Sequence, residues 1–323
     1  DSISMEQKLI ESANGWWSGR FVFDVANTEL APTNVDEQVA LGRIAVSGKL
    51  QDFDFAAWQA LSEWGNSLSI AVDGTLPSSL GDTRAAAQIF ETMNLGAGNM
   101  GLSISNLSYG PPSWQEFKIG GLNLNMSYDN GARPGAYSFN LDWQGLEQTD
   151  SDIPPTFFTH TGALKLHLEQ FPLRQILTSM LRETENLSPP DDPVDNDFSA
   201  PLQLMVLSLI NANQTRLRLE ELTMRSSIAA LTASANMSAE KNSALGVVGN
   251  AHLELAGLDK LIAVAARQAV SGEDTKELIA FLAFAKGLGK PGVGTEGELI
   301  YVYDVVLPAD GIVLINEIPL DLL

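Results

Sequence analysis

Strict alternation of apolar and polar residues is the clearest pattern along this chain. Every second residue is apolar in residues 122–128 and again in residues 137–143. A period of two places the apolar residues on one face of a β-strand and the polar residues on the other. The dipeptide Asn130-Gly131, between the two runs, is typical of a hairpin turn. The pattern therefore predicts an antiparallel hairpin with one apolar face and one solvated face.

The same reasoning predicts further strands and a smaller number of helices. Alternation or short apolar runs predict strands at residues 21–25, 44–50, 67–75, 101–109, 164–168, 216–220, 227–237, 246–255, 298–307 and 312–315. Helical periodicity predicts short helices at residues 55–64, 84–93, 173–185, 201–210, 258–269 and 275–286. We therefore expect an α+β protein, mainly an antiparallel sheet of amphipathic strands with short helices packed on one side.

Three segments share the order strand, helix, connector, helix, strand. A strand leads directly into a helix at Leu50-Gln-Asp-Phe53, Leu168-Glu-Gln-Phe171 and Leu255-Ala-Gly-Leu258. After a second helix, apolar strands resume near residues 102, 217 and 300. The pattern indicates a strand–helix–helix–strand repeat. The alternative is that any chain of strands and helices produces such matches by chance.

Residues 187–199 are a polar stretch that contains Pro189-Pro190 and a cluster of aspartates. This composition is too polar and too rich in proline for the interior of a helix or strand. It predicts a boundary between an N-terminal α+β region, residues 1–187, and a C-terminal α+β region, residues 199–323. A long surface loop within one continuous domain is the alternative.

The net charge of the chain limits the classes of molecule that it is expected to bind. The 323 residues carry 40 acidic and 19 basic side chains, for a formal net charge of −21. Such a field repels phosphate, so we expect no nucleic-acid partner, and it also opposes binding to anionic lipid head groups. The chain has no cysteine, which excludes disulfides, thiolate metal sites and a cysteine nucleophile.

Motifs that carry enzyme chemistry are missing or stand in the wrong context. Two G-x-G-x-x-G matches, residues 96–101 and 287–292, each follow a predicted helix and precede a strand, the reverse of a dinucleotide site. The histidines His160, His167 and His252 are not spaced as zinc ligands, and the aspartate cluster lacks the spacing of a calcium loop. We therefore expect no catalytic residue, no metal, no cofactor and no enzymatic activity.

The sequence predicts no segment that spans a membrane, because it lacks an apolar run of about 18 residues. The chain begins at Asp1 without a methionine. We expect that a signal peptide or membrane anchor has been removed, or that the chain is a truncated piece.

Several stretches resemble bacterial envelope proteins of unknown function. The stretches are Asn14-Gly-Trp-Trp-Ser-Gly19, Asn213-Gln-Thr-Arg-Leu-Arg-Leu-Glu-Glu-Leu222, Gly249-Asn-Ala-His-Leu-Glu-Leu-Ala-Gly-Leu-Asp259 and Asp310-Gly-Ile-Val-Leu-Ile-Asn-Glu-Ile-Pro-Leu320. The order of residue types in these stretches is similar to that in AsmA-like and YdgA-like proteins. The resemblance is best over the last third of the chain. The resemblance implies a periplasmic protein, or one anchored in the inner membrane and facing the periplasm. It implies contact with the membrane only through a removed N-terminal anchor, and it carries over no active site.

The apolar face of the hairpin is the candidate site. Its residues are Leu122, Leu124, Met126, Tyr137, Phe139, Leu141 and Trp143. Helices, a second sheet or a ligand must cover such a face. We expect a non-enzymatic envelope protein that binds or shields an apolar ligand such as lipid. The alternative is a structural or protein-interaction module of the envelope with a sealed core and another envelope protein as its partner.

Overall fold

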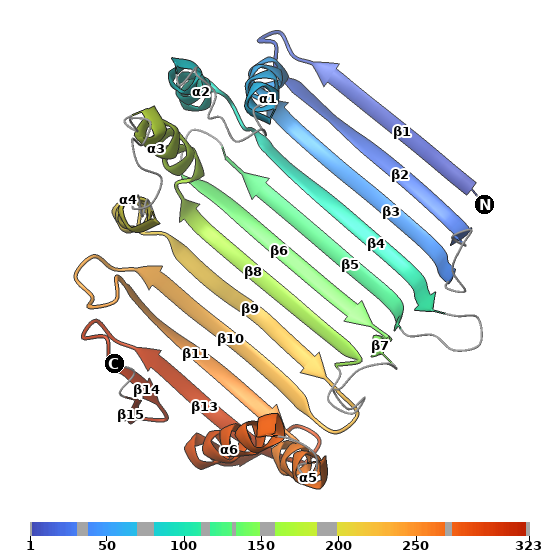
Figure 1. Cartoon of the computed structure of the whole chain (residues 1–323), viewed down its shortest axis with the longest axis vertical. Helices are drawn as coiled ribbons and strands as arrows, with labels where there is room; N and C mark the ends of the chain where they lie inside the picture. The colour runs from blue at the N-terminus through green and yellow to red at the C-terminus, as the bar shows by residue number, and fades with distance from the viewer. Residues whose placement is uncertain are drawn as a thin grey trace.

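A computed structural model describes residues 2–30, 38–69, 81–110, 117–130, 134–148, 159–185, 199–268 and 273–320. These residues form one open antiparallel sheet in which strands adjacent in sequence are adjacent in space (Figure 1). Its first strands are β1 (Ser2–Glu11), β2 (Trp17–Leu30), β3 (Gln38–Phe53), β4 (Ala97–Gly110), β5 (Phe117–Asp129), β6 (Gly135–Gln144) and β8 (Thr161–Phe171). The sheet continues through β9 (Arg216–Arg225), β10 (Ala230–Ala239), β11 (Val247–Ala256), β13 (Leu299–Leu307), β14 (Val313–Ile315) and β15 (Ile318–Leu320). Two short strands lie off this path: β7 (Glu147–Gln148) pairs with β5, and β12 (Lys290–Val293) pairs with β13.

Pairs of helices interrupt this meander at three connections. They are α1 (Phe55–Ser69) and α2 (Gly81–Thr92) after β3, α3 (Leu173–Glu185) and α4 (Ser199–Ala212) after β8, and α5 (Leu258–Gln268) and α6 (Glu273–Leu288) after β11. The order strand, helix, helix, strand thus occurs three times, at the places where the sequence indicates it. The prediction of a mainly antiparallel sheet with short helices is confirmed.

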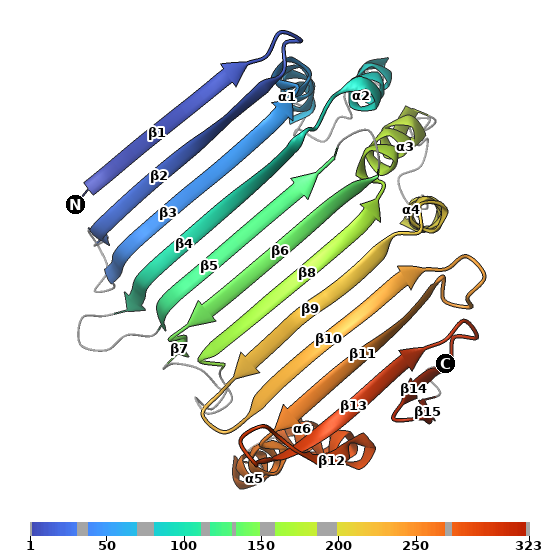
Figure 2. The same ribbon diagram turned by 180° about the vertical axis from the view of Figure 1, so that it is seen from behind.

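The helices stand at the ends of the strands and do not lie along the middle of the sheet (Figures 1 and 2). The first four gather at one end of the strands, and α5 and α6 lie at the opposite end. The sequence pattern predicts helices packed on one side of the sheet but not their placement at the strand ends. The reason is topological, because a helix pair inserted between neighbouring antiparallel strands leaves and re-enters the sheet at the same end.

Local chemistry fixes where these helices begin. Asp54 precedes α1, and its Oδ1 accepts a hydrogen bond of 3.0 Å from the N–H of Ala57. This is the N-cap arrangement that satisfies a free amide of the first helical turn. Gly257, which joins β11 to α5, has a φ of +77°, and a Cβ there would lie 2.0 Å from the carbonyl oxygen of Ile228. Only glycine fits that left-handed and crowded position.

The buried hydrophobic clusters lie among the helices, at the two ends of the sheet. Met93, Ala86 and Leu61 form one cluster with partly buried neighbours from α1, α2 and α3. Leu258 and Leu282 form the other cluster, with Ala265 and Tyr301. By contrast, β6, β8, β9, β10 and β11 are described throughout, and none of their hydrophobic side chains is buried.

Several boundaries differ from the sequence predictions. The strand predicted at residues 67–75 is wrong at its start, because residues 67–69 continue α1 with the helical spacing of Leu61, Trp64 and Leu68; the remainder lies outside the described residues. The turn at Gly131 and most of the stretch 187–199 also lie outside them. The strands β8 and β9, on either side of the proposed boundary between regions, pair directly in one sheet.

Candidate functional site: an uncovered apolar sheet face

The register of the β5–β6 hairpin brings the predicted face together. Leu122 lies opposite Trp143, Leu124 opposite Leu141, Met126 opposite Phe139, and Tyr137 opposite Tyr128. All seven predicted residues therefore share one side of the hairpin, because opposed residues of an antiparallel pair point to the same face. Most of them are partly buried, and Met126 is 42% exposed.

The same face extends far beyond the hairpin. Following the register from strand to strand, the row through Leu124 is apolar from β1 to β13. We call these residues the central apolar row. They are Met5, Phe23, Val46, Leu102, Leu124, Leu141, Leu164, Leu222, Ala233, Leu253 and Tyr303. The neighbouring row on one side is also largely apolar, through Met100, Met126, Phe139, Leu166 and Leu219. We call the side of the sheet that carries these rows the apolar face.

Among the described residues, helices cover the apolar face only at the strand ends, where Tyr303 packs against the α5–α6 cluster and donates a hydrogen bond of 3.0 Å to the carbonyl oxygen of Ala285. No member of the central apolar row is buried, and Met5 and Phe23 are 70% and 37% exposed. Met100 and Met126 in the neighbouring row are 44% and 42% exposed. The side chains of a covered sheet interior would be buried on both sides. Away from the strand ends, the apolar face is therefore open among the described residues.

Glycines beside aromatic residues shape this surface. A Cβ at Gly162 would lie 2.1 Å from the ring of Trp143, and a Cβ at Gly48 would lie 2.2 Å from the ring of Phe21. Each ring therefore rests across the backbone of the next strand, in space that a side chain would otherwise fill. The indole Nε1 of Trp143 donates a hydrogen bond of 3.1 Å to the carbonyl oxygen of Thr159, which fixes this position. Rings held in this way extend the apolar surface across glycine positions.

The opposite side of the sheet is polar and hydrogen bonded. Ser103 donates to the side chain of Asn123 at 2.8 Å, and Asn123 donates to Asp142 at 2.9 Å. Lys165 on β8 forms an ion pair with Glu221 on β9 at 2.6 Å. The two sides of the sheet thus differ sharply in chemistry, as the alternation predicts.

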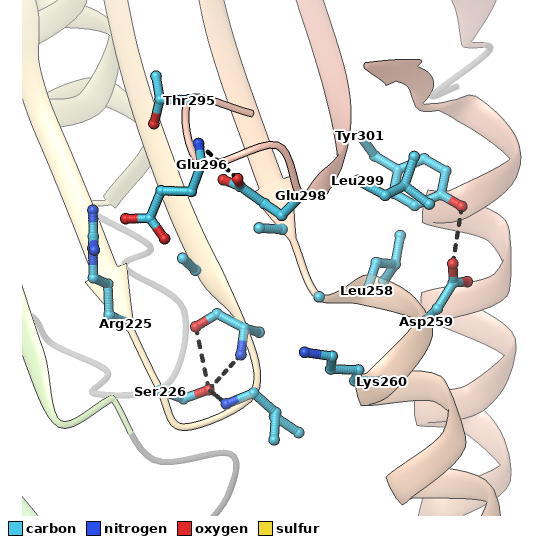
Figure 3. A pocket seen from close by; sticks show the side chains of 15 residues that line it. Arg225, Ser226, Leu258, Asp259, Lys260, Thr295, Glu296, Glu298, Leu299 and Tyr301 are labelled. Atoms are coloured by element: carbon cyan, nitrogen blue, oxygen red, sulfur yellow. Dashed lines mark hydrogen bonds between the residues drawn. The ribbon is translucent and has the colours of Figure 1, made fainter. Parts of the chain in front are cut away.

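A cleft of about 440 Å³ lies where β9, β10 and β13 meet the start of α5 (Figure 3). It contains both signs of charge, with Arg225 and Lys260 on some walls and Glu296 and Glu298 on the β12–β13 connection. The carboxylate of Glu298 accepts a hydrogen bond of 2.9 Å from the N–H of Glu296. With Asp259 also on its wall, the cleft is lined by two cationic side chains and three carboxylates.

The histidines singled out in the sequence lie apart from one another in the fold. His160 lies within 3.1 Å of the carbonyl oxygen of Leu146, and His167 pairs with Glu220. His252 on β11 lies 2.7 Å from Asp304 of β13 on the polar side of the sheet. Both glycine-rich matches connect a helix to a strand, as expected: the first enters β4 and the second enters β12.

Sequence reasoning located one hairpin of the apolar face but missed its extent. The signal was present in β2, where Phe21, Phe23 and Val25 alternate with polar or smaller residues, and in the alternation of β4. The cleft could not be found from sequence, because its walls come from three separate connections. No protein-family model, no curated protein and no solved structure matches this chain. Among the described helices, none combines the length and the apolar character needed to cross a bilayer.

Proposed function

We propose that this chain is a non-enzymatic protein of the bacterial cell envelope that binds or shields an elongated apolar ligand, such as the acyl chains of a lipid, on its apolar face. The central apolar row supports the proposal, because it runs without interruption from Met5 to Tyr303 and none of its members is buried by the described residues. Contiguous exposed apolar surfaces larger than a few hundred Å² mark sites of interaction with ligands, membranes or proteins.

The dimensions of the face suit acyl chains. Neighbouring strands lie about 4.8 Å apart, so the central apolar row extends over roughly ten spacings, or about 48 Å. The hydrocarbon core of a bilayer is about 30 Å thick, so one acyl chain of a single leaflet is about 15 Å long. An extended chain therefore crosses about three strand spacings. Each methylene that leaves water on the face contributes about 0.8 kcal/mol.

The charge of the protein selects among lipids. A formal net charge of −21 opposes a head group with net negative charge. The proposed ligand is therefore a lipid with a neutral or zwitterionic head group. The location in the envelope rests on the resemblance to AsmA-like and YdgA-like proteins.

The first test is native mass spectrometry of the protein purified from bacterial cells without detergent. The expected spectrum contains the 34.7 kDa chain with additional masses that fragment into lipids. A spectrum of bare protein, together with no binding of an uncharged apolar dye such as N-phenyl-1-naphthylamine, would overturn the proposal. That outcome would instead favour the structural module, whose face a protein partner covers.

A pair of variants in β6 tests which face binds. Leu141→Gln places an amide in the centre of the apolar face, and Asn140→Gln changes the adjacent residue on the polar face. Burying a leucine-sized apolar group is worth about 1.5–3 kcal/mol, so loss of half that contact weakens binding by about four- to twelvefold. We expect Leu141→Gln to weaken binding of N-phenyl-1-naphthylamine by about this factor and Asn140→Gln to leave it unchanged. Equal affinities in two folded variants would show that the dye binds elsewhere.

A further inference from the structure

The first strand of the sheet presents a long unpaired edge. All ten residues of β1 are exposed, and among the described residues β1 pairs only with β2. Its pairing with β2 runs from Ser2 to Glu11 without a register shift, so the strand is straight and has no bulge. A long regular edge strand exposes a row of free N–H and C=O groups that can pair with another strand.

The opposite edge of the sheet is built differently. It ends in β14 and β15, which are three residues each, and β15 carries Pro319, which has no N–H to donate. Asn316, in the turn between them, donates from Nδ2 to the carbonyl oxygens of Leu288 at 2.7 Å and Val302 at 2.8 Å. Short strands and proline are the usual means of preventing edge pairing. Among the described residues, one edge of the sheet is thus protected and the other edge, β1, is open.

We propose that β1 pairs antiparallel with β1 of a second copy of this chain, with Gln7 opposite Gln7 at a two-fold axis. In this register Glu6 of each copy lies opposite Lys8 of the other. Met5 of each copy lies opposite Leu9 of the other, on the apolar face. Opposite charges and apolar pairs directly across an antiparallel pair stabilise it by roughly 0.2–1 kcal/mol each.

The charged residues of β1 make the neighbouring registers of this pairing less stable. Moving the two-fold axis by one residue, which slides the strands by two residues, places Glu6 opposite Glu6 in one direction and Lys8 opposite Lys8 in the other. Like charges directly opposite each other are destabilising. Lys8 also lies opposite Arg20 within its own chain, and Arg20 pairs with Glu6 at 2.8 Å. In the proposed register, Glu6 of the second copy therefore places a carboxylate beside Lys8, next to which Arg20 also lies.

The pairing continues the apolar face across the dimer. A two-fold axis perpendicular to the sheet keeps the same side of both copies together, so Met5 and Leu9 of the two copies join the two apolar faces. Ile3 and Met5, which are 73% and 70% exposed in the single chain, then lie beside a neighbouring strand. This inference stands on the edge of β1 alone and does not depend on the identity of a ligand.

Sedimentation of charge variants tests the register. The parent chain should be dimeric. Lys8→Glu leaves four carboxylates facing one another and should raise the dissociation constant of the dimer at least tenfold. The double variant Glu6→Lys with Lys8→Glu restores opposite charges in the proposed register and should recover the dimer. A parent chain that is monomeric at 100 μM, or a double variant no better than Lys8→Glu, would overturn the proposal.

A disulfide tests the same geometry directly, because the chain has no cysteine of its own. Opposed Cα atoms in an antiparallel pair are about 4.5 or 5.5 Å apart, within the range that a disulfide bridges. Gln7→Cys should therefore form a covalent dimer under mild oxidation. In the control, Ile3→Cys, the two sulfurs lie about eight residues apart along the strands and should not bond. Equal cross-linking of the two variants would show random collision and would also overturn the pairing.

Discussion

At the scale of single residues, the apolar face depends on glycines that make room for aromatic rings. Gly162 is the clearest case, since any side chain there would collide with the indole of Trp143 at 2.1 Å. The ring is also held by its hydrogen bond to Thr159, so it has little freedom to move aside. Small residues at these positions are therefore required by the neighbouring strand and not by their own backbone.

Gly162→Val should destabilise the protein by about 1–3 kcal/mol, the usual range for overpacking, although valine favours strands. Urea unfolding followed by tryptophan fluorescence measures the change. Gly287→Ala is the control, and it should change the free energy of unfolding in the opposite direction. No atom lies within 4 Å of a Cβ at Gly287 in α6, so alanine should stabilise that helix by about 0.5–1 kcal/mol. A Gly162→Val variant as stable as the parent would show that the ring moves freely.

The imidazole of His252 should titrate above the ordinary value for histidine. Its hydrogen bond to Asp304 raises the pKa of His252, and a weaker bond to Glu254 at 3.3 Å adds to the effect. A raised pKa in the folded state stabilises the fold fully below the unfolded value of about 6.5, and this contribution is lost as the pH rises through the folded pKa. The contribution is small, because both side chains are about half exposed.

Nuclear magnetic resonance titration of the His252 ring measures this pKa without relying on stability. Asp304→Asn removes the carboxylate but keeps a similar shape, so the pKa of His252 should fall. Glu296→Gln, in the distant β12–β13 connection, should leave it unchanged. A pKa that does not respond to Asp304→Asn would show that the two side chains are not bonded in solution.

At the scale of elements, the strands and helices contribute to stability in different ways. Met93 in the helix cluster is fully buried, with 0% exposure. Phe139, in the middle of β6, remains partly exposed although it is the larger side chain. The sheet is stabilised by cross-strand contacts along one uncovered face, whereas the helix clusters have closed interiors.

Truncating the smaller side chain, Met93, should therefore cost more stability than truncating the larger one, Phe139. Met93→Ala should cost about 2–5 kcal/mol, as for a buried side chain. Phe139→Ala should cost less than the lower end of the range for buried phenylalanine, about 3 kcal/mol, and less than Met93→Ala. Urea unfolding of both variants measures the difference. A larger loss for Phe139→Ala would show that the apolar face is sealed in solution, contrary to the proposed function.

Elements with strong local patterns were predictable from the sequence. The β5–β6 hairpin follows from alternation alone, and the helix α3 has the predicted bounds, Leu173–Glu185. The strand β1 was missed because Ser-Ile-Ser-Met-Glu-Gln-Lys-Leu-Ile-Glu alternates imperfectly and is exposed on both sides. In β9, the spacing Leu217-x-Leu219-x-x-Leu222 reflects a shift in register between Leu219 and Leu222 that keeps both on the apolar face.

The absence of a covering layer over the described apolar face could not be predicted from the sequence. Alternating strands look the same whether helices, a second sheet or a ligand covers them. The pattern fixes which side of a strand is apolar. What lies over that side depends on where the connections return, and here the helix pairs return at the strand ends (Figure 2).

At the scale of the whole molecule, contacts are arranged almost in one dimension. Each long strand of the described sheet pairs with its neighbours in sequence. The main exception is the contact between α2 and α3, which includes an ion pair of Glu91 with Arg182. In such an array stability is close to a sum of terms between neighbours, as in repeat proteins. Opening can then begin at a free edge and move inward.

Amide hydrogen exchange should show this gradient. Strands near the middle of the sheet, β5 to β9, must lose several neighbours before they open, whereas β1 loses only β2. Exchange should be fastest in β1, slower in β2 and β3, and slowest in β5 to β9, because local opening requires less free energy at an edge than global unfolding does. The measurement is best made on Lys8→Glu, so that pairing between copies does not protect β1. The exchange rates of the parent chain are then compared with those of Lys8→Glu. Pairing between copies should slow exchange in β1 alone, so a difference confined to β1 would show that this edge is paired in the parent. Equal protection from β1 to β13 in the variant would instead mean that the sheet opens as one cooperative unit.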